Sequence, residues 1–187
     1  SGMVPVGDGE TYIMPVEVCE NRYPIRVDQY CLDPSPAGAG MHRGGFGLVR
    51  DYRILSDEAE VTTTFGRHKY PPWGGAGGLQ GSPNGAAVIR NGEKTEEIRA
   101  GKLARYPLRK NDVVRLVTGT GGGCGPPLER DPALVARDVW NGLLTPADAE
   151  VSYGVVLHAG EAETADSMVD LEKTAALREG RRERSNR

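Results

Sequence analysis

The sequence has few cysteines and histidines, and their spacing argues against a metal centre. The three cysteines lie far apart, and no two have the short separation of a zinc knuckle. The histidines are equally scattered and form no metal-binding pair. These residues are Cys19, Cys31, Cys124, His42, His68 and His158. We therefore expect no metal site within this chain.

Long apolar runs and an excess of basic charge are also missing. No apolar segment approaches the roughly 20 residues that cross a bilayer, and the first twenty residues lack the apolar core of a secretory signal. The net charge is -3 with the signs intermixed, which argues against a nucleic-acid-binding surface. We expect a cytoplasmic protein that binds neither nucleic acid nor membranes.

Glycine and proline, by contrast, are abundant, with 26 glycines and 13 prolines in 187 residues. The chain must bend often, and short runs that favour extended structure lie between the bends. These runs span residues 23–32, 47–55, 60–65, 86–90 and 112–118. Asn91-Gly92 suits a tight hairpin turn, because both residue types tolerate a positive φ angle. We predict an α+β fold that is mainly β with glycine-rich loops.

Helical signals begin at residue 131. Asp131-Pro132 and Thr145-Pro146 each combine an N-terminal cap with a proline in the first turn. They predict a short helical segment near 132–150, after which "YGVVL" at 153–157 reads as a strand. Residues 164–187 predict an amphipathic C-terminal helix with five arginines among the last ten residues. These arginines indicate either a solvated helix end or a tail that docks on an acidic partner.

The glycine loop at 119–125 does not match the common nucleotide-binding motifs. A Walker loop needs a lysine after its last glycine, but Pro126 follows here. A dinucleotide loop that begins with Gly119 and Gly121 would need a third glycine where the chain has Cys124. The loop is therefore either a close-packed turn, or a place where a ligand or another chain approaches bare backbone.

Two more glycine-dense segments and their surroundings carry candidate functional side chains. Arg43 precedes a glycine pair, and Trp73 follows two prolines that make a rigid apolar elbow. Arg67 is able to hold a carboxylate or carbonyl oxygen through two hydrogen bonds, or else to bond loop carbonyls in a structural role. The candidates for contact with a substrate or an interface are Arg43, Arg67, Trp73, Gly121, Gly122 and Gly123. No catalytic residue is assigned.

Three segments, in this order, resemble the C-terminal part of the hydantoinase B/oxoprolinase family. They run from "MPVEVCENRYPIRVDQYCLD" through "GRHKYPPWGGAGGLQGS" to "GTGGGCGPPLERDPALVARDVW" and the residues that follow, and together they cover about 14–158. The resemblance implies a family region at 1–160 and a charged helical tail at 161–187.

The resemblance implies a place in an ATP-dependent enzyme. Members are B-type subunits of N-methylhydantoinases, oxoprolinases and caprolactam-type lactamases, with relatives in acetone and acetophenone carboxylases. An A-type partner binds ATP and phosphorylates a carbonyl oxygen, and the B-type portion helps convert the activated product. The family's metal-binding His and Asp residues lie in an N-terminal portion that has no counterpart here. The chain is thus expected to bind no cofactor itself, with ATP, Mg and a divalent metal in partner subunits.

The sequence also departs from the family pattern at two places. Relatives commonly read Gly-Asp-Pro after the glycine loop, whereas this chain has Gly125-Pro126-Pro127. Relatives commonly show Asp-Arg before the Pro-Pro-Trp element, whereas this chain has Gly66-Arg67. Two carboxylates that would orient neighbouring groups are absent, which favours a role in shaping a site or an assembly.

We therefore expect a small or split B-type subunit, or a fragment of one, from an ATP-dependent cyclic-amide hydrolase. Its expected partners are an A-type ATP-binding subunit and an N-terminal B-type portion in a hetero-oligomer, and the chain alone is expected to be inactive. If Ser1-Gly2 is a cloning remnant, Met3 is a candidate start, which favours a separate subunit. Two alternatives stay open: the equivalent part of an ATP-dependent ketone carboxylase, and a purely structural assembly module.

Overall fold

A computed structural model describes residues 14–98, 101–158, 160 and 163–185 of the chain. The chain divides into two compact units, each built from segments that are separated in the sequence. The first, here called the sheet unit, comprises Ser1–Asp33, Phe46–Pro72 and Pro83–Thr120. The second, the helical unit, comprises Pro34–Gly45, Trp73–Ser82 and Gly121–Arg187.

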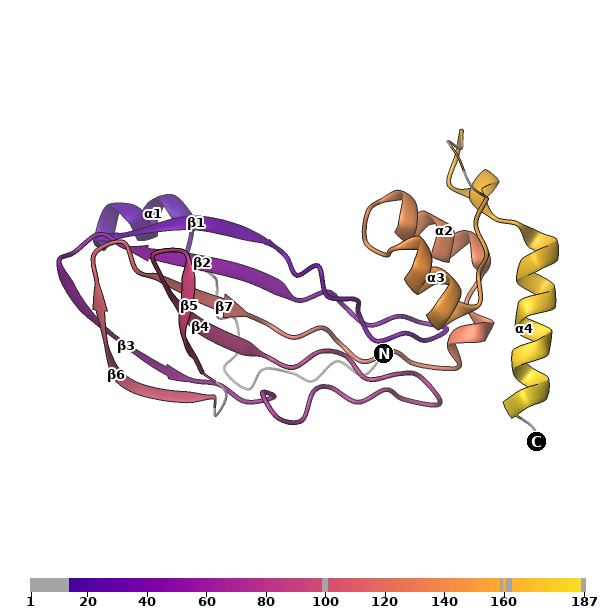
Figure 1. Ribbon diagram of the computed structural model, residues 1–187, viewed down its shortest axis with the longest axis horizontal. Coiled ribbons are helices and arrows are strands. Elements are labelled where there is room, and N and C mark those ends of the chain that lie inside the picture. Colours follow the sequence, from indigo (N-terminus) through magenta and orange to yellow (C-terminus); the bar gives the residue numbers. More distant parts are fainter. Residues whose placement is uncertain (1–13, 99–100, 159, 161–162, 186–187) are drawn as a thin grey trace. The chain divides into compact units, whose positions relative to one another are not determined.

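The sheet unit holds one short helix and two antiparallel sheets (Figure 1). Five strands hydrogen-bond in the order β1-β2-β7-β4-β5, and β3 pairs with β6 in a separate two-stranded sheet. The elements are α1 (Val16–Arg22), β1 (Ile25–Leu32), β2 (Leu48–Ile54), β3 (Glu58–Thr64), β4 (Gly85–Arg90), β5 (Glu93–Glu97), β6 (Lys102–Arg109) and β7 (Val113–Val117).

The core of the sheet unit lies between these two sheets. Ile54, Val88, Leu108 and Val114 are buried together, and Val61 of β3 packs against them. Exposure alternates along the whole of β3, which is the pattern of a strand with one buried face. The two-stranded sheet therefore covers one face of the larger sheet.

All five runs that the sequence predicts as extended are strands, namely β1, β2, β3, β4 and β7. The predicted turn at Asn91-Gly92 is confirmed, with φ angles of 54° and 83°. Two further strands carry no such signal. β5 is almost entirely charged, and β6 contains Pro107 and several exposed charged residues, although its Tyr106 and Leu108 pack in the core between the sheets.

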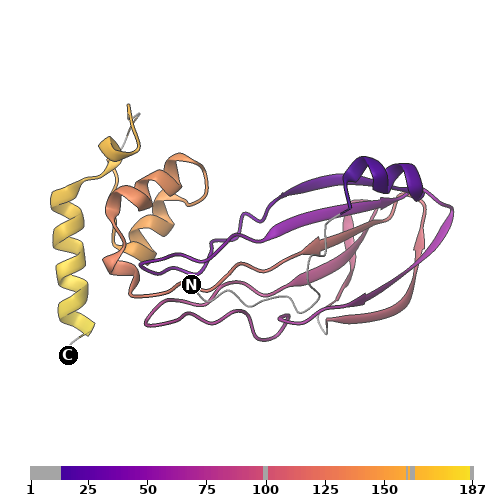
Figure 2. The same ribbon diagram turned by 180° about the vertical axis from the view of Figure 1, so that it is seen from behind.

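The helical unit contains three α-helices and two single 3-10 turns among its described residues (Figure 2). The elements are η1 (Pro127–Glu129), α2 (Pro132–Trp140), α3 (Pro146–Tyr153), η2 (Asp166–Met168) and α4 (Leu171–Ser185). Both predicted N-terminal caps form: Asp131 accepts from the amide of Ala133, and Thr145 accepts from the amide of Asp148. The helical segment near 132–150 and the C-terminal helix are confirmed, so the α+β class holds.

The predicted strand at 153–157 is wrong. Tyr153 ends α3, and Gly154 caps that helix with a φ of 60°. Only Leu157 makes a single bridge, to Val169. Tyr153 and Val155 are instead buried in the core of this unit. A short apolar run is compatible with a strand or with a buried helix end, and periodicity alone does not distinguish them.

The C-terminal helix begins later than predicted, at Leu171, because residues 166–168 form a 3-10 turn. Asp170 ends this connection, and its carboxylate accepts a hydrogen bond from the amide of Lys173 in the first turn of α4. Among the described residues, no helix is both long and apolar enough to cross a membrane.

Candidate functional site

Three glycine-rich segments lie side by side in the helical unit, at 38–44, 73–79 and 121–125. Cys124 is in the middle of this arrangement, since it forms an antiparallel bridge with His42 and a parallel bridge with Gly75. The amide of His42 donates to the carbonyl of Cys124 at 2.9 Å, and the amide of Gly75 donates to Gly123 at 2.8 Å. The three glycine clusters of the sequence are thus one hydrogen-bonded structure.

The glycines are there because backbones approach one another too closely for side chains. A Cβ atom on Gly122 would lie 2.0 Å from the carbonyl oxygen of Trp73, and one on Gly123 would lie 2.2 Å from that of Ala39. A Cβ on Gly121 would lie 3.0 Å from the amide nitrogen of Gly45. Close packing therefore accounts for these glycines. Their contact with a substrate or a subunit stays a prediction.

Most backbone amides of the 121–125 segment are already used inside the unit. Gly121 donates to Gly45 at 2.8 Å, Gly123 to Leu79 at 2.9 Å, and Gly125 to Gly75 at 2.9 Å. A phosphate-binding loop needs amides that point at the ligand. The hydrogen bonding agrees with the sequence argument that this segment is not an ordinary nucleotide loop.

Arg43 is held by a buried carboxylate of α2. Its Nε donates to Asp138 at 2.8 Å and its Nη2 at 3.3 Å, and Nη1 donates to the carbonyl of Gly44. Asp138 is 7% exposed and also accepts from Nη2 of Arg130 at 3.0 Å. One buried carboxylate therefore binds two guanidinium groups through charge-assisted hydrogen bonds.

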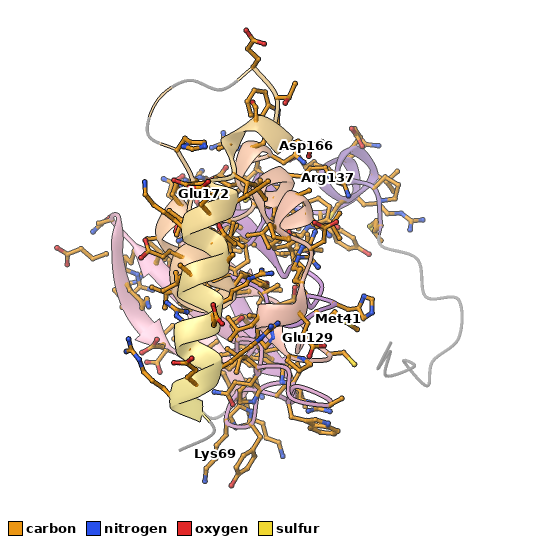
Figure 3. All side chains as sticks on the ribbon, turned by 90° about the vertical axis from the view of Figure 1, so that its right-hand side faces the viewer. Met41, Lys69, Glu129, Arg137, Asp166 and Glu172 are labelled. Carbon is orange, nitrogen blue, oxygen red and sulfur yellow. The ribbon has the colours of Figure 1, made fainter. Side chains whose placement is uncertain are left out.

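Arg130 extends this network to other elements. Its Nη1 donates to the carbonyl of Met41, a residue labelled in Figure 3, and its guanidinium lies 5.9 Å from the ring centroid of Tyr153. Burial raises the pKa of Tyr153, so its phenol stays neutral. The network fastens the 38–44 segment to α2 and α3.

Sequence reasoning missed Asp138 and Arg130. The signal for Asp138 is its place three residues after Val135, since both lie on the buried face of α2. An acidic residue on an otherwise apolar helix face requires a cationic partner.

Arg67 belongs to the sheet unit and has a φ of 56°, in the left-handed region. Its carbonyl accepts from the amide of Asn84 at 3.0 Å. The side chain of Asn84 also donates to Gly66 at 2.9 Å and accepts from the amide of Gly119 at 2.6 Å. Asn84, which sequence reasoning did not select, thus fixes the backbone around Arg67.

Trp73 belongs to the helical unit, and this residue is 72% exposed. Its backbone is the part that packs, because its carbonyl lies against Gly122. A large apolar side chain at such exposure is a feature of interaction surfaces. The structure therefore brings Arg43, Trp73 and the 121–123 glycines into one unit, and Arg67 into the other.

Within the part of the chain that the structure describes, no three His, Cys, Asp or Glu side chains are grouped so that they could hold a metal ion. The described cysteines Cys19, Cys31 and Cys124 form no disulfide.

The family model for hydantoinase B/oxoprolinase matches residues 1–127. The chain is 36% identical over 165 residues to the B-type polypeptide of a putative D-/L-hydantoinase from Pseudomonas sp. (strain NS671), covering 88% of this chain and 26% of that one. It is 33% identical over 148 residues to the beta chain of caprolactamase from Pseudomonas jessenii, covering 76% of this chain and 25% of that one.

Two solved structures share the fold. The ATP-dependent caprolactamase from Pseudomonas jessenii has a TM-score of 0.69 and 29% identity, over 88% of this chain and 28% of that one. An acetone carboxylase has a TM-score of 0.73 at 22% identity, over 94% of this chain and 27% of that one, which shows the fold alone. This chain spans about a quarter of the length of these relatives. With the family model matching more than half of its residues, the chain belongs to the hydantoinase B/oxoprolinase family.

Proposed function

We propose that this chain is the C-terminal portion of a B-type subunit, or a split version of it, in an ATP-dependent cyclic-amide hydrolase. The observation that carries the proposal is the likeness to caprolactamase in both sequence and structure. The match to the B-type polypeptide of a putative hydantoinase supports the same reaction class. Both names describe enzymes that act on cyclic amides.

The chemistry that we propose for the complex begins with phosphorylation of the amide oxygen by ATP. Phosphorylation converts a poor electrophile into one with a good leaving group. ADP leaves in this first step. Water then attacks the activated carbon, phosphate leaves and the ring C–N bond breaks, which gives one open-chain product that carries a carboxylate and an amine or urea nitrogen. We propose that the partners, namely an A-type subunit and an N-terminal B-type portion, bind ATP, Mg²⁺ and a divalent metal.

We propose that this chain shapes the site or the assembly. In support, the Arg43 guanidinium donates to Asp138, and three amides of the 121–125 segment donate to backbone within the unit. Trp73 and Arg67 stay candidates for contact with substrate or a subunit, and the exposure of the Trp73 ring supports an interface. Because the proposed reaction consumes ATP, we also propose a cytoplasmic location.

The test is a pull-down of the tagged chain from its native source, with intact masses of everything retained. We expect recovery of an ATP-binding subunit. We also expect a protein equivalent to the three quarters of the B-type relatives that this chain does not cover. The recovered complex is assayed with ATP on hydantoin, caprolactam and 5-oxoproline, and in parallel on acetone with bicarbonate.

We expect the isolated chain to be inactive and ring opening to occur only in the complex. Robust turnover by the purified chain alone contradicts the proposal. Carboxylation of acetone without ring opening replaces it by the ketone carboxylase alternative. The assembly-module alternative replaces it if Arg43→Ala and Arg67→Ala both change assembly or stability and both leave turnover per assembled complex intact.

A further inference from the structure

The sheet unit contains a groove of about 340 Å³ between the two-stranded β3–β6 sheet and the five-stranded sheet, apart from the glycine segments described above. Its walls are mostly apolar and come from Ile54, Val61, Leu108, Val114 and Leu116, with Tyr52 at one side. Grooves of this size suit small molecules, which are held by apolar walls and oriented by a few polar groups.

Two buried polar atoms near this groove have no hydrogen-bond partner among the described residues. They are the hydroxyl oxygen of Thr63, which lines the groove, and Nε of Arg50. Buried polar atoms are normally paired, because leaving one unpaired costs about 1 to 3 kcal/mol. Thr63 lines the groove and Arg50 does not, so a ligand in the groove would have to reach the neighbouring Arg50 side chain to serve as the partner of both atoms.

The strand register places Arg50 beside the groove. Arg50 lies on the same face of β2 as Tyr52, and it pairs across the ladder with Leu116 of β7. Both Tyr52 and Leu116 line the groove. Thr63 follows Val61 by two residues on the inward face of β3, so it also points to this space.

The Arg50 side chain is oriented by two aromatic rings. Its guanidinium carbon lies 4.9 Å from the ring centroid of Tyr30 and 4.9 Å from that of Tyr52. Such contacts use the flat faces of a guanidinium and leave the N–H groups at its edge to bind an anion. Burial raises the pKa of Tyr52, so its phenol carries no negative charge to compete for Arg50.

Arg50 differs in this respect from the other arginines of the same sheet. Arg53, Arg90 and Arg115 each form an ion pair with an aspartate. Among the ion pairs of the described residues, none involves Arg50. Glu60 at the rim of the groove is paired with Arg105 at 3.1 Å, which offsets the charge that would otherwise repel an anion.

We propose that this groove binds a small carboxylate with an apolar body, in which Arg50 holds the carboxylate and the Thr63 hydroxyl donates a further hydrogen bond. The apolar walls cover the hydrocarbon part. A single cation and mainly apolar walls suit one negative charge better than the double charge of a phosphate. The proposal goes beyond the proposed function and does not depend on it.

The first test is a titration of the 187-residue chain with hexanoate, followed by methyl NMR and calorimetry. Saturable binding is expected, with shifts of the Val61 and Leu116 methyl groups. The uncharged analogue hexanamide is expected to bind at least about tenfold more weakly, since it loses the charge-assisted bond. Equal binding of the two probes, or no saturable shift of these methyls with hexanoate, would overturn the proposal.

The second test uses variants. Arg50→Gln is expected to weaken hexanoate binding at least about tenfold, and Thr63→Val, which keeps the side-chain shape, severalfold. The control is Arg26→Gln, because Arg26 is an exposed arginine of β1 that pairs with Asp28 and does not line the groove. Unchanged affinity in a folded Arg50→Gln variant contradicts the proposal. If circular dichroism shows that Arg50→Gln does not fold, Thr63→Val and the hexanamide comparison decide.

Discussion

At the residue scale, glycines in this chain serve different purposes that the type of residue does not reveal. Gly122 and Gly123 have no room for a side chain, because carbonyl oxygens occupy the space. Gly45, in the same glycine-rich region, would have nothing within 4 Å of an added Cβ. Gly92 also has open space and is required only for its positive φ.

This contrast yields a first prediction. Gly122→Ala should destabilise the helical unit by at least about 3 kcal/mol, because the new methyl group collides with the Trp73 carbonyl and backbone must move. Gly45→Ala is the matched control and should change stability by less than about 1 kcal/mol. Urea unfolding followed by circular dichroism measures both, and similar stabilities for the two variants would refute this account of the glycine segment.

Also at the residue scale, an ion pair between Asp112 and Arg90 stabilises the sheet unit. Its carboxylate accepts from Nε of Arg90 at 2.9 Å and from Nη2 at 2.7 Å, as well as from the amide of Arg109. The Arg90 hydrogen bonds hold the pKa of Asp112 below its ordinary value, although burial opposes this. A group with a lowered folded-state pKa stabilises the fold above its ordinary pKa and loses that contribution as pH falls through the folded value.

We therefore predict that Asp112→Asn lowers the free energy of unfolding by about 2 kcal/mol at pH 7. The difference from wild type should shrink as the pH falls below about 4, since protonation removes the same charge from the wild-type protein. Unfolding at a series of pH values measures this. Asp57→Asn is the control, because Asp57 is 90% exposed in its pair with Lys110 and should matter little at any pH.

At the scale of the element, α4 is attached by a polar face. The hydroxyl of Thr174 accepts from the amide of Val156 at 3.0 Å. Arg178 donates to the carbonyl of Tyr153 at 3.0 Å and to that of Arg130 at 2.8 Å, and Arg181 donates to the carbonyl of Val151 at 2.7 Å. Tyr153 and Val151 lie in the last turn of α3, where carbonyls have no partner within the helix.

The sequence predicted either a solvated helix end or a docking tail, and neither prediction describes all of the arginines in α4. Two of its arginines bind carbonyls of the chain itself, whereas Arg182 and Arg184 are exposed near the end of the helix. The exposed pair agrees with a solvated helix end. Docking on an acidic partner stays a prediction, and the fifth arginine of the tail, Arg187, lies outside the described residues.

The corresponding prediction concerns attachment of the helix. Arg178→Gln should reduce the stability of the helical unit by about 1 to 3 kcal/mol and raise amide exchange along α4, because two carbonyls lose a charged donor. Arg184→Gln should leave both quantities unchanged, since Arg184 is exposed. Hydrogen exchange with mass spectrometry compares the two, and equal exchange rates would speak against attachment through Arg178.

At the scale of the whole molecule, the chain is about a quarter of the length of its relatives and consists of two units with separate cores. Arg43 lies deep in the network of one unit, where its guanidinium donates to Asp138 and Gly44. A substrate would have to compete with these bonds for the same nitrogen atoms. The geometry therefore favours a structural role for Arg43.

We predict that Arg43→Ala lowers the yield of the reconstituted complex but leaves turnover per assembled complex unchanged. The truncation leaves the buried Asp138 with Arg130 as its remaining described partner and should cost the isolated chain about 2 to 4 kcal/mol. Size-exclusion chromatography with an activity assay separates the two effects. A complex of normal size with reduced turnover would instead indicate that Arg43 contacts the substrate.

The sequence by itself determined those features that depend on interactions between neighbouring residues. Caps at Asp131 and Thr145, the turn at Asn91-Gly92 and the five apolar runs act over a few neighbouring residues, so their structures follow from nearby side chains. Ordered motifs also showed the family. The conformation of "YGVVL" and of the segments that form β5 and β6 depended on packing against the rest of the chain, because their own residues favour no single conformation.

Only the tertiary structure decided which distant residues meet. Pairing of Arg43 with Asp138 joins positions 95 residues apart, and the three glycine segments come together from 38–44, 73–79 and 121–125. Likewise, Arg50 and Thr63 become candidates for a ligand only when their burial and their lack of described partners are known. Such features arise from long-range burial and desolvation, which depend on the whole packed chain and leave no mark in the spacing of neighbouring residues.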